Sequence, residues 1–325
     1  MGFAGRVEAL RSRIEEEIRE LFLDREPGCL YEPMVYPLEA GGKRIRPVLV
    51  ILACQAVGGE VKDCLDAALA VELLHTFTLV HDDIMDHDSI RRGRPTVHAK
   101  WDEPTAILAG DGLVAMAYRV LLRTEHPELI SVLQRFTDGL LTLCEGQALD
   151  KAFEIRDGIS VEEYNDMIEK KTSKLFEVAC EIGAILGGGD VKEREALRRF
   201  ATCFGKAFQI QDDLLDVLSE EEISGKPLGS DLIEKKKTYL AIHFFGNASS
   251  SEKARFRRLW EKNPIAREDI LEIKALFKGV GTFQEARKDV EELLSEALRS
   301  LDPLPPGEAK EDLRTLAVKI QERVC

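Results

Sequence analysis

Apolar residues recur at helical spacing through most of this chain. Within residues 63–90, Leu65, Leu69, Leu73 and Phe77 follow one another at intervals of four, which places them in one buried stripe of an α-helix. Comparable spacing recurs in four further stretches, at about 102–122, 126–150, 160–186 and 192–219. No stretch shows the strict alternation of apolar and polar residues that is typical of a half-buried strand. The pattern therefore predicts an all-α fold.

Interruptions of the helical pattern coincide with glycine and proline. They fall at residues 58–59, 92–95, 187–189, 225–227 and 303–307. The outer segments, at about 4–24 and 251–325, read as richly charged amphipathic helices, which we expect at the periphery. The chain has neither an evident linker nor a fine repeat, and its 325 residues can bury a sizeable core. We therefore expect residues 1–325 to form a single domain, one large helical bundle.

Charge and cysteine content exclude several function classes. A formal net charge of -14 argues against general nucleic-acid binding, which depends on a basic surface, so an anionic substrate must be met by local basic clusters. The 7 cysteines show no C-x-x-C pairing and follow no signal-peptide pattern, so we expect reduced thiols in a cytoplasmic protein. The richest apolar runs are short or interrupted, and we expect no transmembrane segment.

One acidic motif, D-D-x-x-D, occurs twice. Its members are Asp82, Asp83 and Asp86 in the first copy, and Asp212, Asp213 and Asp216 in the second. Residues i and i+4 of a helix lie one above the other, so each copy presents two carboxylates on one face. Apolar residues flank both copies, where a solvated acidic face would carry Lys or Ser. We therefore expect two helices to direct these carboxylates into one central cavity.

Converging carboxylates need compensation by bound cations or by protonation. Two unit charges about 4 Å apart interact by roughly 4 kcal/mol at an effective dielectric constant near 20. Ligation by carboxylates alone suits a hard ion that keeps water ligands and bridges to phosphate oxygens, which describes Mg²⁺ better than zinc or iron. His81 and His87 flank the first motif, but no H-x-x-x-H or Cys/His set accompanies them. Mg²⁺ is therefore the expected metal, and a chance acidic helix end is the alternative.

Basic residues gather near both acidic motifs and in one earlier turn. The turn at 41–47 carries three cations at the entrance of an apolar helix, where positive charge and backbone N–H groups can meet a phosphate. Arg91 and Arg92 follow the first motif and either form salt bridges to Asp86 or Asp88 or bind a diphosphate. The remaining candidates are the lysines at 170–174, the lysines at 226–237, and His75. Taken singly, each is also typical of a solvated surface or, for the histidine, of a core.

Together these motifs resemble those of a known family, the trans-isoprenyl diphosphate synthases or short-chain polyprenyl synthases. In the family's order, the chain carries G-G-K-R-I-R-P, H-D-D-I-M-D-H-D-S-I-R-R-G-R-P-T, G-Q-A-L-D, K-K-T-S-K-L-F, F-Q-I-Q-D-D-L-L-D and G-K-P-L-G-S-D-L-I-E-K-K-K-T. The likeness is greatest to archaeal-type geranylgeranyl diphosphate synthases. It implies an all-α isoprenoid-synthase fold, usually a homodimer, with the cavity between the two Asp-rich helices.

The resemblance also implies a reaction and its substrates. Isopentenyl diphosphate condenses head to tail with an allylic diphosphate, giving a short-chain all-trans prenyl diphosphate. The allylic C–O bond ionises, the isopentenyl double bond attacks the carbocation, and a proton is lost. No Ser-His-Asp or Cys-His nucleophile is needed. The residues that would carry ionisation are Asp82, Asp86, Asp212, Arg91 and Lys171.

Further roles follow residue by residue from the same resemblance. Three Mg²⁺ would be bound by Asp82, Asp86 and Asp212, with outer or water-mediated ligation by Asp83, Asp213 and Asp216. The allylic diphosphate or its metal shell would be contacted by Arg91, Lys171, Thr172, Gln209, Lys226 and Lys236. Isopentenyl diphosphate would be contacted by Lys43, Arg46, His75 and Arg92, and supporting roles would fall to Gln147 and Asp150. Because Lys235, Lys236 and Lys237 are consecutive, the choice of Lys236 depends on alignment.

Product length would depend on the floor of an apolar tunnel leading away from the metals. Phe77 lies about 7.5 Å along and about 140 degrees around an ideal helix from Asp82, so geometry alone assigns it to the core and favours Thr78 as tunnel wall. The resemblance instead implies that a bulky residue at the position of Phe77 limits elongation. It also associates an aromatic at the position of Thr78 with fifteen-carbon product. We therefore expect twenty-carbon geranylgeranyl diphosphate, with farnesyl diphosphate or a mixture as the alternative.

Three other functions compete with prenyl condensation. A terpene cyclase or head-to-head condensing synthase also ionises diphosphates, but it has no need for the homoallylic site implied by Lys43, Arg46 and Arg92. A noncatalytic regulatory subunit would be favoured by loss of an aspartate from either motif, and none is missing. A plain helical scaffold leaves the ordered motifs unexplained.

Overall fold

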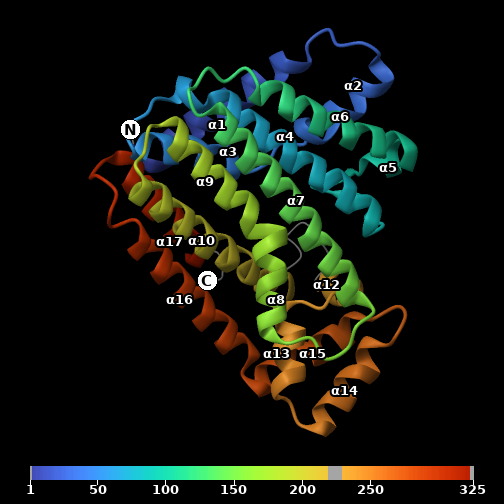
Figure 1. Ribbon diagram of the computed structural model, residues 1–325. Coiled ribbons are helices and arrows are strands. Elements are labelled where there is room, and N and C mark those ends of the chain that lie inside the picture. The colour runs from blue at the N-terminus through green and yellow to red at the C-terminus, as the bar shows by residue number, and fades with distance from the viewer. Residues whose placement is uncertain (1, 219–228, 323–325) are drawn as a thin grey trace. The chain divides into compact units, whose positions relative to one another are not determined.

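The computed structural model describes residues 2–218 and 229–322, which are almost entirely helical (Figure 1). The helices of the N-terminal half are α1 (Phe3–Phe22), α2 (Gly28–Glu39), α3 (Ile45–Ala56), α4 (Val61–Met85), α5 (Val97–Lys100), α6 (Glu103–Leu121) and α7 (Leu129–Glu154). Those that follow are α8 (Val161–Ile168), the π-helix η1 (Glu169–Ser173), α9 (Lys174–Leu186), α10 (Val191–Leu218), α12 (Ser230–Ile233), α13 (Tyr239–Asn247), α14 (Ser250–Trp260), α15 (Arg267–Val280), α16 (Thr282–Ser300) and α17 (Glu308–Gln321). The prediction of an all-α fold is confirmed.

The chain divides into two compact units. Unit 1 contains the described residues of 1–140, 178–198 and 302–313, and unit 2 contains those of 141–177, 199–301 and 314–325. The first acidic motif and the basic turn belong to unit 1, whereas the second acidic motif belongs to unit 2. The expectation of a single domain over residues 1–325 stays a prediction.

The core of unit 1 is formed by α4 with α3 and α6, which pack against it (Figure 1). All residues from Val48 to Cys54 of α3 are buried, as expected for a helix that is apolar on all sides. A capping box between Glu60 and Asp63 starts α4, and Leu69 and Leu73 of its apolar stripe are buried, while Leu65 and Phe77 are partly exposed. Unit 1 therefore fixes the helix that ends in the first acidic motif.

Among the described residues, α4 is also the one helix long and apolar enough to cross a membrane. Its most apolar window is 67% buried inside the protein. Such burial is typical of the core helix of a globular protein, which passes the same test of length and composition.

The core of unit 2 contains a cluster of aromatic rings. Phe244 of α13 lies 5.0 Å from Phe256 of α14, and Phe256 lies 5.6 Å from Phe277 of α15, between ring centroids. All three rings are fully buried. A second contact, between Phe176 and Phe204 at 5.3 Å, joins α9 to α10. The charged helices α14 and α15 thus each bury an aromatic ring, in keeping with their amphipathic sequences.

Two local departures from the predicted helices matter for the site. The helix expected over 63–90 ends at Met85, and a two-stranded antiparallel sheet follows, formed by β1 (Ile90–Arg91) and β2 (Arg94–Pro95). Its turn residues, Arg92 and Gly93, have φ values of 52° and 71°, as a tight hairpin turn requires.

The second departure is η1, which interrupts the helix expected over 160–186. The backbone of η1 passes directly against two glycines. A Cβ atom on Gly205 would lie 2.6 Å from Cα of Ser173, and one on Gly146 would lie 2.7 Å from Cα of Lys171. Any larger residue would push this segment away, so both glycines are required by its close approach.

Candidate active site

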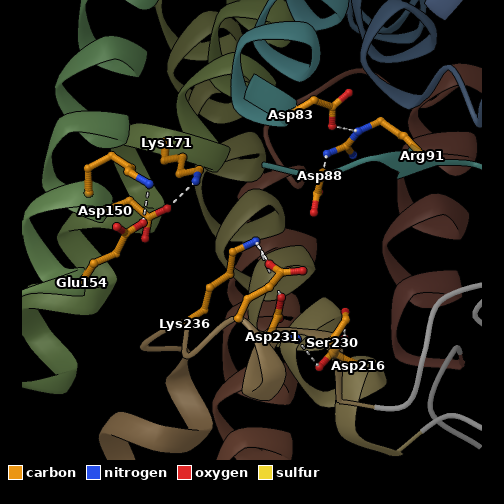
Figure 2. Close-up of polar contacts among 12 residues, drawn as sticks. Asp83, Asp88, Arg91, Asp150, Glu154, Lys171, Asp216, Ser230, Asp231 and Lys236 are labelled. Atoms are coloured by element: carbon orange, nitrogen blue, oxygen red, sulfur yellow. Dashed lines mark hydrogen bonds and ion pairs between the residues drawn. The ribbon is translucent and has the colours of Figure 1, made fainter. Parts of the chain in front are cut away.

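The first acidic motif lies at the C-terminal end of α4. Asp82 and Asp86 are partly exposed and stay one helical turn apart, since the Asp86 N–H donates to the Asp82 carbonyl at 2.8 Å. Asp83 is 4% exposed and accepts a hydrogen bond from Arg91 Nε at 2.5 Å (Figure 2). Burial raises the pKa of Asp83, and the positive charge of Arg91 opposes that rise. Arg91 also lies 3.6 Å from Asp88, so it forms salt bridges near the motif, as one of the two sequence alternatives predicts.

The basic turn is held in an unusual backbone conformation. Gly41, Gly42 and Arg44 have φ values of 72°, 152° and 49°, and α3 begins at the next residue, Ile45. The Arg92 guanidinium lies against the turn, because its Nη1 donates to the Gly41 carbonyl. The φ of 152° at Gly42 is one that residues with a side chain rarely adopt, which favours glycine there, and a Cβ atom would also lie 2.8 Å from that nitrogen, so the Arg92 side chain would have to move. The hairpin that carries Arg92 is thereby joined to the turn that carries Lys43.

A histidine of α4 completes the basic group of unit 1. Arg46 Nη1 lies 3.1 Å from His75 Nε2. Burial, together with the positive charges of Arg46 and Arg92, holds the pKa of His75 well below its ordinary value of 6.5. The imidazole is therefore neutral near pH 7, and Nε2 accepts the hydrogen bond from Arg46. Unit 1 thus gathers Arg46, His75 and Arg92 beside the turn on which Lys43 is exposed.

The second acidic motif lies on α10 in unit 2. Asp213 is 3% exposed and accepts hydrogen bonds from Tyr164 Oη at 2.5 Å, from the Tyr239 N–H at 2.9 Å and from Gln209 Nε2 at 3.0 Å. Burial raises its pKa to about 7. Asp212 is partly exposed. With three donors on one buried carboxyl group, Asp213 is arranged to fix α10 against its neighbours.

Asp216, the last member of the second motif, is held by a short helix. Its two oxygens accept hydrogen bonds from Ser230 Oγ at 2.5 Å and from the Asp231 N–H at 3.1 Å (Figure 2). The sequence did not indicate these partners, nor Tyr164 and Tyr239 as partners of Asp213. A lone tyrosine or serine carries no sequence signal for a carboxylate so distant along the chain.

Predicted diphosphate contacts of unit 2 line one cavity of about 130 Å³, together with Asp213. They are Lys171, Thr172, Gln209 and Lys236. Lys171 forms a salt bridge with Asp150, and Thr172 Oγ1 donates to Gln209 Oε1 at 2.8 Å (Figure 2 shows the salt bridge). Asp150 thus lies beside Lys171 at this cavity, and Gln147 is buried on the same helix, α7. Their supporting roles stay a prediction. These contacts bring together residues from α7, η1, α10 and the segment after α12.

The choice among the three consecutive lysines is narrowed by their positions. Lys236 and Lys237 both line the cavity. Lys236 Nζ lies 2.7 Å from Glu234 Oε2, and Lys237 Nζ donates to the Arg156 carbonyl. Lys235 is exposed and does not line it. Lys226, the remaining predicted contact, lies outside the described residues.

The two residues considered for product length adjoin each other on α4. The Phe77 ring is partly exposed and meets the His81 ring edge-on, with centroids 4.7 Å apart. Thr78 is 8% exposed, and its Oγ1 donates to the His75 carbonyl at 2.8 Å. Neither position tests whether Phe77 or Thr78 forms a tunnel floor, so that assignment stays a prediction.

Carboxylate oxygen is the donor chemistry that both motifs offer to a metal. Residues 2–218 and 229–322 contain no group of three or more His, Cys, Asp and Glu side chains that could hold a metal ion. Each motif alone offers at most two partly exposed carboxylates, Asp82 with Asp86, or Asp212 with Asp216. Such sparse oxygen ligation fits Mg²⁺, which keeps several waters and takes further oxygens from a substrate phosphate.

Comparison with known proteins identifies the family. A family model described as polyprenyl synthetase matches residues 27–277. A short chain isoprenyl diphosphate synthase of Methanothermobacter thermautotrophicus is 41% identical over 310 residues, covering 95% of this chain and 95% of the relative. A geranylgeranyl diphosphate synthase of Methanosarcina mazei is 45% identical over 236 residues, covering 72% of this chain and 73% of the relative. The crystal structure of geranylgeranyl pyrophosphate synthetase from Pyrococcus horikoshii matches with a TM-score of 0.94 at 40% identity, covering 99% of this chain and 98% of that one.

The extent of these matches decides the class of the protein. The chain belongs to the polyprenyl synthetase family. Within that family it is a prenyltransferase that builds prenyl chains by condensation. The resemblance found in the sequence is therefore confirmed, and so is the all-α isoprenoid-synthase fold.

Proposed function

We propose that the protein catalyses the Mg²⁺-dependent condensation of isopentenyl diphosphate with allylic diphosphates, and that its main product is geranylgeranyl diphosphate. The observation that carries this proposal is the cavity of unit 2, where Lys171, Thr172, Gln209 and Lys236 surround one space beside the second acidic motif. The gathering of Arg46, His75 and Arg92 in unit 1 supports a separate site for the homoallylic partner. The product assignment is supported by Phe77 and Thr78 and by the names of the relatives.

The residues divide the work of the reaction by charge. Lys171, Lys236 and Arg91 bind the negative oxygens of the allylic diphosphate. Three Mg²⁺, held by Asp82, Asp86 and Asp212, would neutralise the charge that develops on this leaving group, while Asp83, Asp213 and Asp216 hold their neighbours or bound water. Arg46 and Arg92 bind isopentenyl diphosphate with Lys43, and neutral His75 orients Arg46.

The bonds then change without a protein nucleophile. The allylic C–O bond breaks with its electron pair on the diphosphate oxygen, which leaves an allylic carbocation. The isopentenyl double bond attacks this cation, and a C–C bond forms. The released diphosphate accepts the proton that is lost. A terpene cyclase would make no use of the basic group of unit 1, which is why condensation is favoured.

A product assay tests the proposal directly. Purified protein is incubated with isopentenyl diphosphate and, separately, dimethylallyl, geranyl or farnesyl diphosphate, with Mg²⁺ or with a chelator. The prenyl alcohols are sized after phosphatase treatment. We expect a twenty-carbon alcohol with Mg²⁺ and no elongation with chelator, because the leaving group then keeps its full charge. Absence of elongation from every starter would overturn the function, and a fifteen-carbon end product would replace geranylgeranyl by farnesyl diphosphate.

We also propose that the protein is a homodimer. Adjacent Ile107 and Leu108 of α6 are 46% and 59% exposed, and exposed apolar neighbours are typical of an interface. Sedimentation should give a particle of twice the chain mass, and the Leu108→Glu variant should sediment with the mass of one chain. Leu23→Glu, at a residue 70% exposed after α1, is the control. A monomeric wild type would contradict the proposal.

A cytoplasmic location completes the proposal. All 6 cysteines that the structure describes are free thiols, as suits a reducing compartment. Recovery of the protein from a cell fraction other than the cytoplasm would contradict this placement.

A further inference from the structure

Arg44, the middle cation of the basic turn, points into the protein. It is 5% exposed, and its Nη1 lies 2.6 Å from Glu72 Oε1 on α4, a residue itself 3% exposed. Its Nη2 donates to the Leu38 carbonyl of α2 at 2.6 Å, and its Nε lies 3.6 Å from Glu15 Oε1 on α1. Three helices therefore hold one guanidinium. Its charge is taken up inside unit 1, whereas its neighbour Lys43 lies exposed on the surface.

The backbone at Arg44 is as constrained as its side chain. With φ 49° and ψ 35°, Arg44 adopts a left-handed backbone conformation that residues other than glycine rarely take. Such a conformation persists only where surrounding contacts enforce it. The buried ion pair supplies that enforcement, and the reversal at Arg44 sets the directions in which Lys43 and Arg46 leave the turn.

The same face of α4 contacts the basic turn at a second residue. Glu72 and His75 are three residues apart, so they are neighbours on the helix surface. Glu72 holds Arg44, while His75 lies 3.1 Å from Arg46. Thr76 Oγ1 donates to the Glu72 carbonyl at 2.9 Å within the helix. The register of the turn against α4 is thus fixed at two adjacent points.

We propose that the buried Arg44–Glu72 ion pair positions the isopentenyl diphosphate site without touching substrate, by setting the basic turn so that Lys43 and Arg46 meet the diphosphate. The inference rests on the proposed function. It adds two positioning residues, one of them inside the K-R-I-R run, where charge alone suggests a direct phosphate contact. It also predicts that the pair affects the homoallylic substrate and spares the allylic one.

The design of the test follows from the energetics of buried charge. Removing one partner leaves an uncompensated charge and endangers folding, whereas replacing both by apolar residues of similar size is often neutral for stability. The variant is therefore the double replacement Arg44→Met with Glu72→Leu. The matched control is Arg6→Met with Asp312→Leu, which removes another ion pair of unit 1, at 2.5 Å, with Asp312 3% exposed.

Steady-state kinetics with each substrate varied separately give the readout, alongside thermal unfolding. We expect the Arg44/Glu72 double variant to unfold near the wild-type midpoint. Its KM for isopentenyl diphosphate should rise about 10–100-fold, because a displacement of about 1 Å at a binding group has effects of that order. Its KM for the allylic diphosphate and its kcat should stay within about threefold of wild type, since the groups that bind and ionise the allylic substrate are not displaced. The Arg6/Asp312 control should change neither KM.

Three outcomes would overturn the inference. They are an unchanged KM for isopentenyl diphosphate in the folded double variant, an equal rise in both KM values, and the same rise in the control. If the double variant does not fold, Arg44→Lys decides, because lysine keeps the charge beside Glu72 but cannot also reach the Leu38 carbonyl in the same geometry. The same selective rise is then expected, and an unchanged KM overturns the inference. A wild type that elongates no allylic diphosphate refutes the proposed function instead, before any variant is measured.

Discussion

Replacement of Asp82 or Asp212 by alanine is expected to lower kcat about 10³-fold while the protein stays folded. The loss follows because each carboxylate would hold Mg²⁺ against the leaving diphosphate, and removal of a group that stabilises developing charge typically costs about 10²–10³-fold. Both residues are partly exposed, so the free energy of unfolding should change by less than about 1 kcal/mol. Turnover at saturating substrates and denaturant unfolding are the measurements.

Controls for the aspartate variants come from exposed acids away from both motifs. Glu20→Ala on α1 and Glu291→Ala on α16 remove the same charge from units 1 and 2, respectively, and should leave turnover unchanged. Near-normal turnover of Asp82→Ala or Asp212→Ala at the Mg²⁺ concentration that just saturates the wild type would refute the assignment of that residue. Raising the Mg²⁺ concentration further distinguishes weakened metal binding from lost catalysis, because turnover recovers only if metal binding was weakened.

Replacement of Phe77 by alanine is expected to lengthen the prenyl products beyond twenty carbons. The Phe77 ring is partly exposed beside the His81 ring and precedes the first acidic motif on α4. Removing the ring therefore opens space without removing a charge. Because the ring is not fully buried, the loss of unfolding free energy should be smaller than the about 3–5 kcal/mol of a buried Phe→Ala replacement. Chromatography of the dephosphorylated products gives the distribution.

A second phenylalanine of unit 1 provides the control for product length. Phe22→Ala removes a ring of the same size from α1, where Phe22 meets Tyr31 with centroids 6.4 Å apart. It should lower stability and leave the product distribution as in the wild type. An unchanged distribution for Phe77→Ala would mean that the tunnel floor lies elsewhere, and Thr78 would then be the next candidate, as helix geometry alone suggests.

Much of the helical architecture was predictable because it follows from local pattern. The stripe of Leu65, Leu69 and Leu73 belongs to α4, and the helices expected at about 102–122 and 192–219 correspond to α6 and α10. The extension of the first helix to residue 90 was wrong. The helix ends at Met85, and Arg92 with Gly93 forms the turn of a hairpin whose strands of two residues are too short to show a period in the sequence.

Partners distant in sequence account for what could not be predicted within the site. Nothing in K-R-I-R distinguishes buried Arg44 from exposed Lys43, because the distinction is made by Glu72 on another helix. Likewise, Asp213 looks equivalent to Asp212 in the motif. Its hydrogen bonds from Tyr164 and from the Tyr239 N–H depend on how α8 and α13 pack against α10, and no local pattern encodes that packing.

The π-helix η1 changes the angular phase of the helical segment that contains it. A turn with i→i+5 hydrogen bonds inserts extra backbone, so residues after it are rotated relative to an uninterrupted α-helix. Tyr164 before η1 and Phe176 after it can therefore both be buried, while Lys171 between them reaches the cavity of unit 2. Deleting one residue from 169–173 would remove this rotation. Tyr164 and Phe176 could then not both be buried while Lys171 lines the cavity.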